Sequence, residues 1–295
     1  MATLIHMLLL YSLPDNSTPD SARDLLHAKW GRENCIVWGR SRQAEFGPYP
    51  HALSIHAVWG GTQHCHVDGR KIAVDDDNFL ILNHGRTCST SIRAAHPVES
   101  LTICFRPDLV GACEQEFIEN LQPHDRAVSP VLRFIRAHLE RGVVDEAWYE
   151  EQLVFLLERM RSRQTRLLEQ IDRIELVRPA TRREAFRRIG LATDFLHANY
   201  SQDVDLGMLA RMAYLSKYHF LRLFTLIHGI TPRKYLQRKR VDVAVRLLES
   251  TRLPISEVTA SVGFAFESTL LRQIRQRTNL SPRQLRTRLL DGDAA

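Results

Sequence analysis

The amino-acid sequence predicts an α+β protein of two domains. We expect an antiparallel β-barrel with flanking helices, followed by an all-α domain in which one pair of helices occurs twice around a long helix. The chain has 295 residues, a length typical of about two domains. Apolar and polar residues alternate up to about residue 107, whereas helical spacing dominates from about residue 108. The stretch that begins at Leu206 is also repeated about fifty residues later, at Ile255.

The first region is predicted to hold short strands between polar turns, over about residues 20 to 107. Leu53–Trp59 and Ser100–Arg106 alternate, and Asp68-Gly69 predicts a hairpin turn between them. Shorter strands are expected at 71–74 and 79–83. In the second alternating run the residues expected to face the core are Leu101, Ile103 and Phe105, and those expected to face outward are Ser100, Thr102 and Arg106. Such a set of strands favours a small antiparallel barrel or sandwich.

Amphipathic helices are expected from about residue 108 to Pro179. They either cap their own barrel or pair with a second copy of the chain, and we expect some self-pairing because two linked binding sites gain avidity. The predicted domains are therefore 1–178, a linker or helix start at 179–189, a helical domain at 190–288 and a tail at 289–295.

The pair His64 and His66 is the strongest candidate for metal chemistry. Their spacing places both imidazoles on one face of a strand. A metal-binding barrel of the cupin type would continue with an acidic ligand and a second motif, but Arg70 and Lys71 follow instead. No nucleophile series or glycine-rich phosphate loop is present in the sequence. We therefore expect no metal, no cofactor and no enzyme; a metal-dependent cupin enzyme with a helical C-terminal extension is the alternative.

Charge is distributed unevenly along the chain, whose net charge is +6. Residues 181–295 contain 20 Lys or Arg and 10 Asp or Glu, whereas residues 1–180 contain 20 and 24. A basic, arginine-rich C-terminal domain indicates a polyanionic partner. Five scattered cysteines without a Cys-x-x-Cys motif indicate a reducing compartment. The apolar run Leu4–Leu13 is too short to span a bilayer, so we expect a cytoplasmic protein without a membrane partner.

The repeated unit has the pattern of two helices joined by a tight turn. Asp205 stands where the first helix should be capped, and Ser216 where the second should be. In the second helix Phe220, Leu223, Phe224 and Ile227 form one face, while Tyr218, Leu221, Arg222 and Thr225 form the opposite face. The copies are offset by 49 residues before the turn and by 50 after it, so one residue is inserted near Ala265-Phe266. A helix over residues 233–249 separates them and can hold two DNA-reading helices about one duplex turn apart.

This region resembles the DNA-binding domain of AraC/XylS-type transcription regulators. The resemblance rests on Leu206-x-x-Leu-Ala, Ser216-x-x-x-Phe-x-Arg-x-Phe, Gly229-Ile-Thr-Pro-x-x-Tyr, Arg240 to Leu248, Ile255-x-Glu-Val, Val262-Gly-Phe and Leu280-Ser-Pro. It implies two helix-turn-helix units, each with one helix in a major groove, and a cupin-like sensor barrel before them. The family pattern implies that the residues facing bases are Tyr218, Leu221 and Arg222 in one groove and Glu267, Ser268, Leu271 and Arg272 in the next.

Further residues are expected to contact phosphates because they lie near predicted helix N-termini: Lys217, Arg233, Lys234 and Arg283. The second unit departs from the first, since Gln273 and Arg277 replace Leu223 and Ile227 and Asn279 replaces a glycine. We therefore expect the first unit to contribute more affinity than the second.

The sequence thus predicts a transcription regulator that binds double-stranded DNA. A small-molecule effector in the N-terminal barrel and a homodimer are expected, with RNA polymerase as a partner if the protein is an activator. A barrel that only dimerises is an alternative within the same class.

Overall fold

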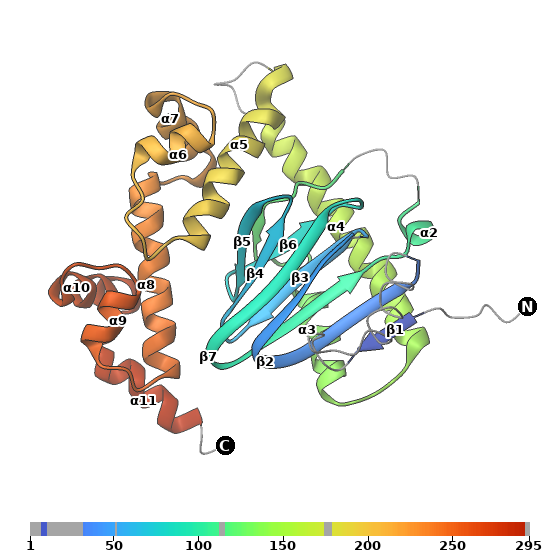
Figure 1. The fold of residues 1–295 in the computed structure, drawn as a ribbon, viewed down its shortest axis with the longest axis horizontal. Helices are drawn as coiled ribbons and strands as arrows, with labels where there is room; N and C mark the ends of the chain where they lie inside the picture. The colour runs from blue at the N-terminus through green and yellow to red at the C-terminus, as the bar shows by residue number, and fades with distance from the viewer. Residues whose placement is uncertain (1–6, 11–31, 51, 112–115, 174–178, 293–295) are drawn as a thin grey trace, which may run out of the picture. The chain divides into compact units, whose positions relative to one another are not determined.

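The computed structural model describes residues 7–10, 32–50, 52–111, 116–173 and 179–292. Contacts divide the chain into two compact units, Met1–Gly190 and Leu191–Ala295. The first contains a β-sheet with helices and the second is helical (Figure 1), which confirms the α+β prediction. Residues 20–31 of the predicted barrel, Cys113 and the last residues of the predicted tail lie outside the described ranges.

In the described residues of the N-terminal unit, eight strands form one sheet in the order β1-β2-β7-β3-β6-β8, while β4 pairs with β5 and β7. The strands are β1 (Met7–Leu10), β2 (Asn34–Pro50), β3 (Ser54–Trp59), β4 (Thr62–Val67), β5 (Arg70–Asp75), β6 (Asn78–Leu82), β7 (Thr87–Cys104) and β8 (Leu121–Pro123). The two long strands bend the sheet, because β7 pairs with β3 near its end and with β4 near its start. The sheet therefore curls around an interior of its own.

Two features of the predicted strands have clear outcomes. The hairpin at Asp68-Gly69 is confirmed: both residues have positive φ, and β4 and β5 pair on either side of them. The described strands from β2 onward pair antiparallel, as predicted, whereas β1, which precedes the predicted barrel, pairs with β2 in parallel. A parallel pair needs a long connection, and the stretch from residue 11 to residue 33 provides it.

Both faces of the central strands are buried, which corrects the expectation that Ser100 and Thr102 face outward. Leu101, Ile103 and Phe105 pack against the helices, as predicted. Ser100 and Thr102, however, are 1% and 6% exposed and face the interior of the curled sheet. Each makes a hydrogen bond there, Ser100 Oγ to Gln63 Oε1 at 3.0 Å and Thr102 Oγ1 with His56 Nδ1 at 3.1 Å. A buried hydroxyl is tolerated when it is hydrogen-bonded, so polar alternation does not prove exposure.

Side chains fill the interior of the curled sheet. An apolar cluster that includes Val58, Cys65, Ile72, Leu80 and Ile92 occupies one part. In another, burial lowers the pKa of His56 to about 4, so its imidazole is neutral at physiological pH. Between Tyr49, Gln63 and Thr102 the remaining cavity measures about 30 Å³. That space is of the size of one water molecule.

In the part of this unit that the structure describes, four helices accompany the sheet: α2 (Pro107–Val110), α3 (Ser129–Glu140), α4 (Glu146–Asp172) and the start of α5 (Pro179–Ala198). Helices α3 and α4 cover one face of it, burying Leu132, Ile135, Leu153 and Leu156 against the strands (Figure 1). An ion pair between Arg136 of α3 and the buried carboxylate of Glu99, at 2.7 Å, also joins α3 to the sheet.

The C-terminal unit consists of the end of α5 and six further helices among its described residues. They are α6 (Leu206–Met212), α7 (Lys217–His228), α8 (Pro232–Ser250), α9 (Ile255–Ser261), α10 (Glu267–Thr278) and α11 (Pro282–Gly292). The predicted pairs and the long helix between them are present, with α6–α7 before α8 and α9–α10 after it. Helix α11 continues through Gly292, into the segment 289–295 for which a tail was expected.

Candidate nucleic-acid interface

Capping fixes the geometry of the first helix pair. Asp205 precedes α6 and its carboxylate accepts a hydrogen bond from the Met208 amide, as predicted. This bond is the largest cause of the lowered pKa of the exposed Asp205 carboxyl group. Ser216 precedes α7 and its hydroxyl accepts from the His219 amide. Both caps satisfy amides that have no partner within the helix, so the two helices start at defined residues.

Helix α7 has a buried face and a face without contacts to the core. Phe220, Leu223 and Phe224 are buried against neighbouring helices, as the spacing predicted. On the opposite side Tyr218 is 74% exposed and Arg222 is exposed, whereas Leu221 is half-buried. An aromatic ring and a guanidinium group therefore stand out from the first two turns of α7, where a reading helix meets base edges.

Helix α10 presents the equivalent residues but buries fewer of its own side chains than α7 does. Leu270 and Ile274 are its buried residues, and Glu267, Ser268 and Arg272 are exposed. Leu271 is half-buried, like Leu221 in the first copy.

The departures of the second pair have a structural basis. Arg277, which takes the position of the apolar Ile227, pairs with Asp242 of α8 at 2.9 Å. Asn279 ends α10 with φ 58°, the conformation that Gly229 has at the end of α7. Asparagine tolerates this backbone region better than most residues, so the exchange is compatible with the same turn.

The turns of the two pairs differ by one residue at the predicted place. Tyr214 and Gly263, separated by the offset of 49, have positive φ of 52° and 78°. In both turns the next amide bonds back to the helix, Leu215 to Ala210 O and Phe264 to Thr259 O. A Cβ atom on Gly263 would lie 2.3 Å from the carbonyl oxygen of Ser201, so the second turn requires glycine for packing as well as for φ. Tyr214, at the equivalent place in the first turn, is 77% exposed.

Arg240 of α8 joins the two pairs. Its guanidinium group donates to three backbone carbonyls: Tyr200 at 2.6 Å, Gln202 at 2.7 Å and Gly263 at 2.7 Å. The first two lie in the connector before α6 and the third lies in the turn before α10. One side chain therefore fixes the start of the first pair relative to the turn of the second. This role of Arg240 could not be predicted from the sequence, because its partners are 23 to 40 residues away in the chain.

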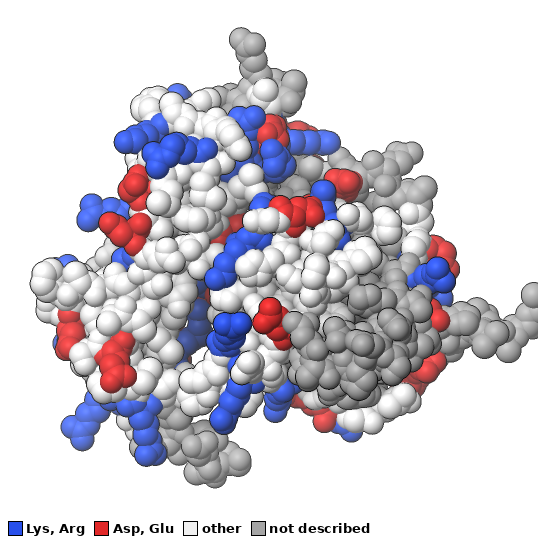
Figure 2. All heavy atoms as spheres, viewed as in Figure 1, with Lys and Arg blue, Asp and Glu red and all other residues white. Residues whose placement is uncertain are grey.

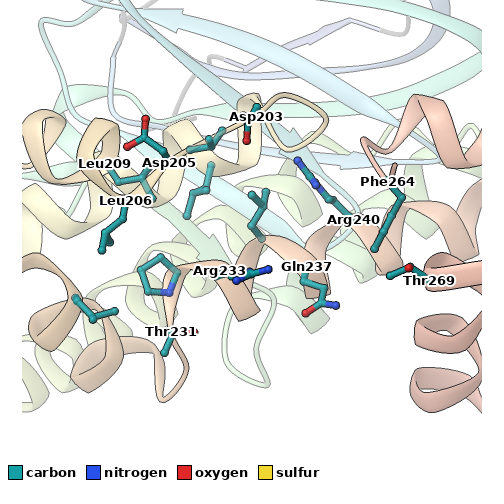
Figure 3. Close-up of a pocket in the computed structure, with 15 residues that line it drawn as sticks. Asp203, Asp205, Leu206, Leu209, Thr231, Arg233, Gln237, Arg240, Phe264 and Thr269 are labelled. Carbon is teal, nitrogen blue, oxygen red and sulfur yellow. The ribbon is translucent and has the colours of Figure 1, made fainter. Parts of the chain in front are cut away.

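A cleft of about 630 Å³ lies within this unit, between the two pairs (Figure 3). Leu206 and Leu209 of α6, Arg233 and Gln237 of α8, and Phe264 and Thr269 of the second pair line it. Leu221, one of the predicted base-contact residues, also borders the cleft. Among the predicted contact residues, Leu221 and Arg233 thus line this cleft, whereas the predicted residues of α10 do not.

The predicted phosphate-contact residues lie at helix starts and are exposed. Lys217 is the first residue of α7, Arg233 and Lys234 are in the first turn of α8, and Arg283 is in the first turn of α11. On the face shown in Figure 2, Lys and Arg side chains gather over α6 and α7. The first turn of α7 contains no acidic residue, whereas Glu267 opens α10. Unpaired helix amides and nearby cations favour anions at these places.

The histidines considered for a metal lie on the outer face of β4. His66 is paired across the hairpin with Lys71, and His64 with Ala73. Burial, Lys71 and His66 lower the pKa of His64 to about 4. Within the described residues, no group of three or more His, Cys, Asp or Glu side chains is arranged to hold a metal ion. The helices in those residues also include none that is long and apolar enough to cross a membrane.

Comparison with known proteins matches the C-terminal part of the chain. Residues 209–288 match the model of a family described as helix-turn-helix domain. A probable transcriptional regulator, LumQ of Photobacterium leiognathi, is 29% identical over 92 residues, covering 31% of this chain and 37% of LumQ. The uncharacterized HTH-type transcriptional regulator YbfI of Bacillus subtilis (strain 168) is 36% identical over 80 residues, covering 27% of this chain and 29% of YbfI.

A solved structure from Chromobacterium violaceum, a transcriptional regulator described with AraC-type DNA-binding domains, is similar over 36% of this chain and 94% of its own, with 24% identity and a TM-score of 0.34. The chain therefore spans about a third of the length of the two curated relatives. Residues 209–288 of this chain therefore form a helix-turn-helix domain that is similar to those of transcriptional regulators.

Proposed function

We propose that this protein is a sequence-specific, DNA-binding transcription regulator that places α7 and α10 in two successive major grooves of one duplex. The observation that carries the proposal is the doubled helix pair, in which Arg222 and Arg272 stand exposed at equivalent positions. Helix α8, with 19 residues, is about 28 Å long at 1.5 Å per residue. Because α7 precedes this helix and α10 follows it, the two reading helices can be separated by about one duplex turn, roughly 34 Å.

Base contacts are assigned to the exposed side of each reading helix. Arg222 and Arg272 have the geometry to bond guanine O6 and N7, and the half-buried Leu221 and Leu271 suit thymine methyl groups. The remaining residues assigned to bases are Tyr218, Glu267 and Ser268. A carboxylate at Glu267 selects for a cytosine amino group and against nearby phosphates, so the second helix reads with less electrostatic attraction.

Phosphate contacts are assigned to Lys217, Arg233, Lys234 and Arg283. Arg233 lies at the edge of the cleft between the helix pairs. In the proposed complex, this cation lies next to the DNA phosphates between the two major grooves. Such contacts orient the protein on DNA without reading sequence.

For the N-terminal unit we propose a cupin-like barrel that forms a homodimer through α3 and α4. These helices and their connection expose apolar side chains that a second copy would cover: Phe134, Val143, Val144, Val154 and Phe155. Exposed apolar patches of this kind mark association surfaces. Two linked DNA-binding units would increase the affinity for a paired operator.

A small-molecule effector fits the end of the barrel better than its filled interior. In the described residues a concavity of about 340 Å³ lies beside Leu53, His84, Phe105 and Phe117, which is of the size of small-ligand sites. An effector bound there, an activator role with RNA polymerase as partner, and a cytoplasmic location complete the proposed function. We assign no catalytic step to the chain.

Selection of bound sequences from random duplex DNA tests the proposal. The expected result is a site with two sequence boxes about ten base pairs apart, with affinity that falls as salt increases. Salt-sensitive binding without sequence preference would reduce the C-terminal unit to a nonspecific basic surface.

A further inference from the structure

A second basic surface lies in the N-terminal unit and contains none of the residues assigned to DNA. The loop before α3 and the second half of α4 enclose a concavity of about 430 Å³. Half of its lining residues are arginines: Arg126, Arg159, Arg163 and Arg166, beside Asp125, Ala127, Leu167 and Gln170. Positions 159, 163 and 166 are three or four residues apart, so one face of α4 carries all three charges.

Arg163 forms the fixed floor of this arginine concavity. It forms an ion pair with Asp125, donates to Gln122 Oε1, and its guanidinium group lies 5.3 Å from the centre of the Phe79 ring. Asp125 is itself held by the amides of Ala127 and Val128, at 2.9 and 2.8 Å. The floor is therefore preorganised and internally neutralised.

The other three arginines have no acidic partner. Among the described residues no carboxylate lies within ion-pair distance of Arg126, Arg159 or Arg166, and all three are exposed. Arg159 is oriented by the Phe155 ring, at 4.6 Å. Like charges at helical spacing destabilise a helix unless a counter-anion lies between them. The concavity therefore presents three uncompensated guanidinium groups around one neutral floor.

We propose that the arginine concavity binds a small multivalent anion that carries several phosphate groups. Guanidinium groups bind phosphate oxygens in pairs, and three of them match an anion with about three charges rather than a single phosphate. The volume of this open concavity lies within the range of small-ligand sites, whereas a duplex backbone would need an extended track of cations. Ala127 and Leu167 add apolar surface for an organic part of the ligand.

Isothermal titration of the full-length chain with inorganic tripolyphosphate, at constant ionic strength, tests this proposal. Saturable binding is expected, with an affinity at least about tenfold above that for orthophosphate. Arg159→Gln and Arg166→Gln should each weaken tripolyphosphate binding about tenfold, as loss of one charge-assisted contact predicts. Tighter binding of adenosine triphosphate than of tripolyphosphate would assign the site to an organic polyphosphate; equal binding would assign it to the inorganic chain.

Two controls locate the effect. Arg141→Gln removes the same charge from an exposed position at the end of α3, outside the concavity, and should leave binding unchanged. A chain with Arg222→Gln and Arg272→Gln should also keep it, because those residues belong to the DNA-binding unit. The proposal is overturned if tripolyphosphate does not saturate, if Arg141→Gln weakens it as much as Arg166→Gln, or if Arg159→Gln and Arg166→Gln lower affinity for duplex DNA instead. Thermal unfolding of each variant checks that it is folded.

Discussion

In the first helix pair α7 buries Phe220, Leu223 and Phe224, whereas in the second pair α10 buries Leu270 and Ile274. The first reading helix starts at a serine cap, but the second starts at Phe266 without a side-chain cap. The second pair is instead held from outside, by the Arg277–Asp242 ion pair and by the bond from Arg240 to Gly263 O.

The difference shows two ways to hold one backbone arrangement. Helix α7 is stabilised by three buried residues of its own and a serine cap. Helix α10 contributes two buried residues to a cluster that it shares with α8 and α9, and polar contacts to α8 and the close fit of Gly263 against Ser201 are added to this cluster. A helix held by its own core keeps its geometry when the surroundings change. We therefore expect the first pair to fix the protein on its operator and the second to tolerate more sequence variation.

The largest expected effect comes from the core of the first pair. Phe224 contacts the rings of Phe220, His228 and Tyr235, with centroids 4.3 to 5.6 Å apart. Phe224→Ala should lower the free energy of unfolding by about 3 to 5 kcal/mol, and Ile274→Ala by less. Hydrogen exchange of the amides in α7 and α10 measures both. A greater loss of protection from Ile274→Ala would reverse the assignment of the stronger core.

Arg240→Lys tests the connection between the pairs. Lysine cannot donate to all three carbonyls in the arginine geometry, and each charge-assisted bond contributes about 1.5 to 3 kcal/mol. We expect the binding free energy for an operator with two sequence boxes to become weaker by about 2 kcal/mol. Binding to a DNA that contains only one of the two boxes should change little. The matched control is Arg238→Lys, at an exposed position of the same helix. Equal losses on both DNAs would show that Arg240 acts on folding rather than on the spacing of the readers.

Acidification should destabilise the first pair through His228. Burial lowers the pKa of His228 from 6.5 to about 4, and its Nε2 lies 3.0 Å from Thr193 Oγ1. Below pH 6.5 the unfolded chain therefore binds a proton that the folded chain does not, and stability is lost as the pH falls towards 4. The loss should reach about 2 kcal/mol at pH 5. Denaturation of the wild type and His228→Gln at pH 7 and pH 5 measures it; an unchanged pH dependence in the variant would exclude His228 as the cause.

Substitution of Arg222 and of Arg272 compares the contributions of α7 and α10 to DNA binding. Arg222→Ala should weaken binding to the selected operator by about 1 to 3 kcal/mol and relax sequence preference in one box. Arg272→Ala should cost less, since Glu267 and a thinner core accompany it. Affinities at one fixed salt concentration decide between them. A larger effect of Arg272→Ala would contradict the view that the first pair dominates.

Local patterns predicted what depends on neighbours in the chain, and failed where distant residues decide. The caps at Asp205 and Ser216, the inserted residue in the second turn and the hairpin at Asp68-Gly69 follow from short-range chemistry, and all are present. The burial of Ser100 and Thr102 depends on strands far away, because an open sheet would leave the same residues in water. Similarly, Arg240 and Gly263 acquire their roles from Tyr200, Ser201 and Gln202. The base and phosphate assignments stay predictions, since they concern DNA.

The smallest expected effect tests whether the ion pair of Arg277 compensates for the smaller number of buried residues in α10. Arg277→Ile would restore the apolar residue found at Ile227 and remove the ion pair with Asp242. Arg277 is 45% exposed in its side chain, so the ion pair contributes about 0 to 1 kcal/mol. The new side chain would be only partly covered, and the gain from burial is of the same order. We expect a net change in unfolding free energy below about 1 kcal/mol.

Asp242→Ala, which removes the same ion pair without adding apolar surface, should be slightly destabilising. If Arg277→Ile instead stabilised α10 by as much as Phe224→Ala destabilises α7, the second pair would be limited by its core, and polar contacts to α8 would not replace it.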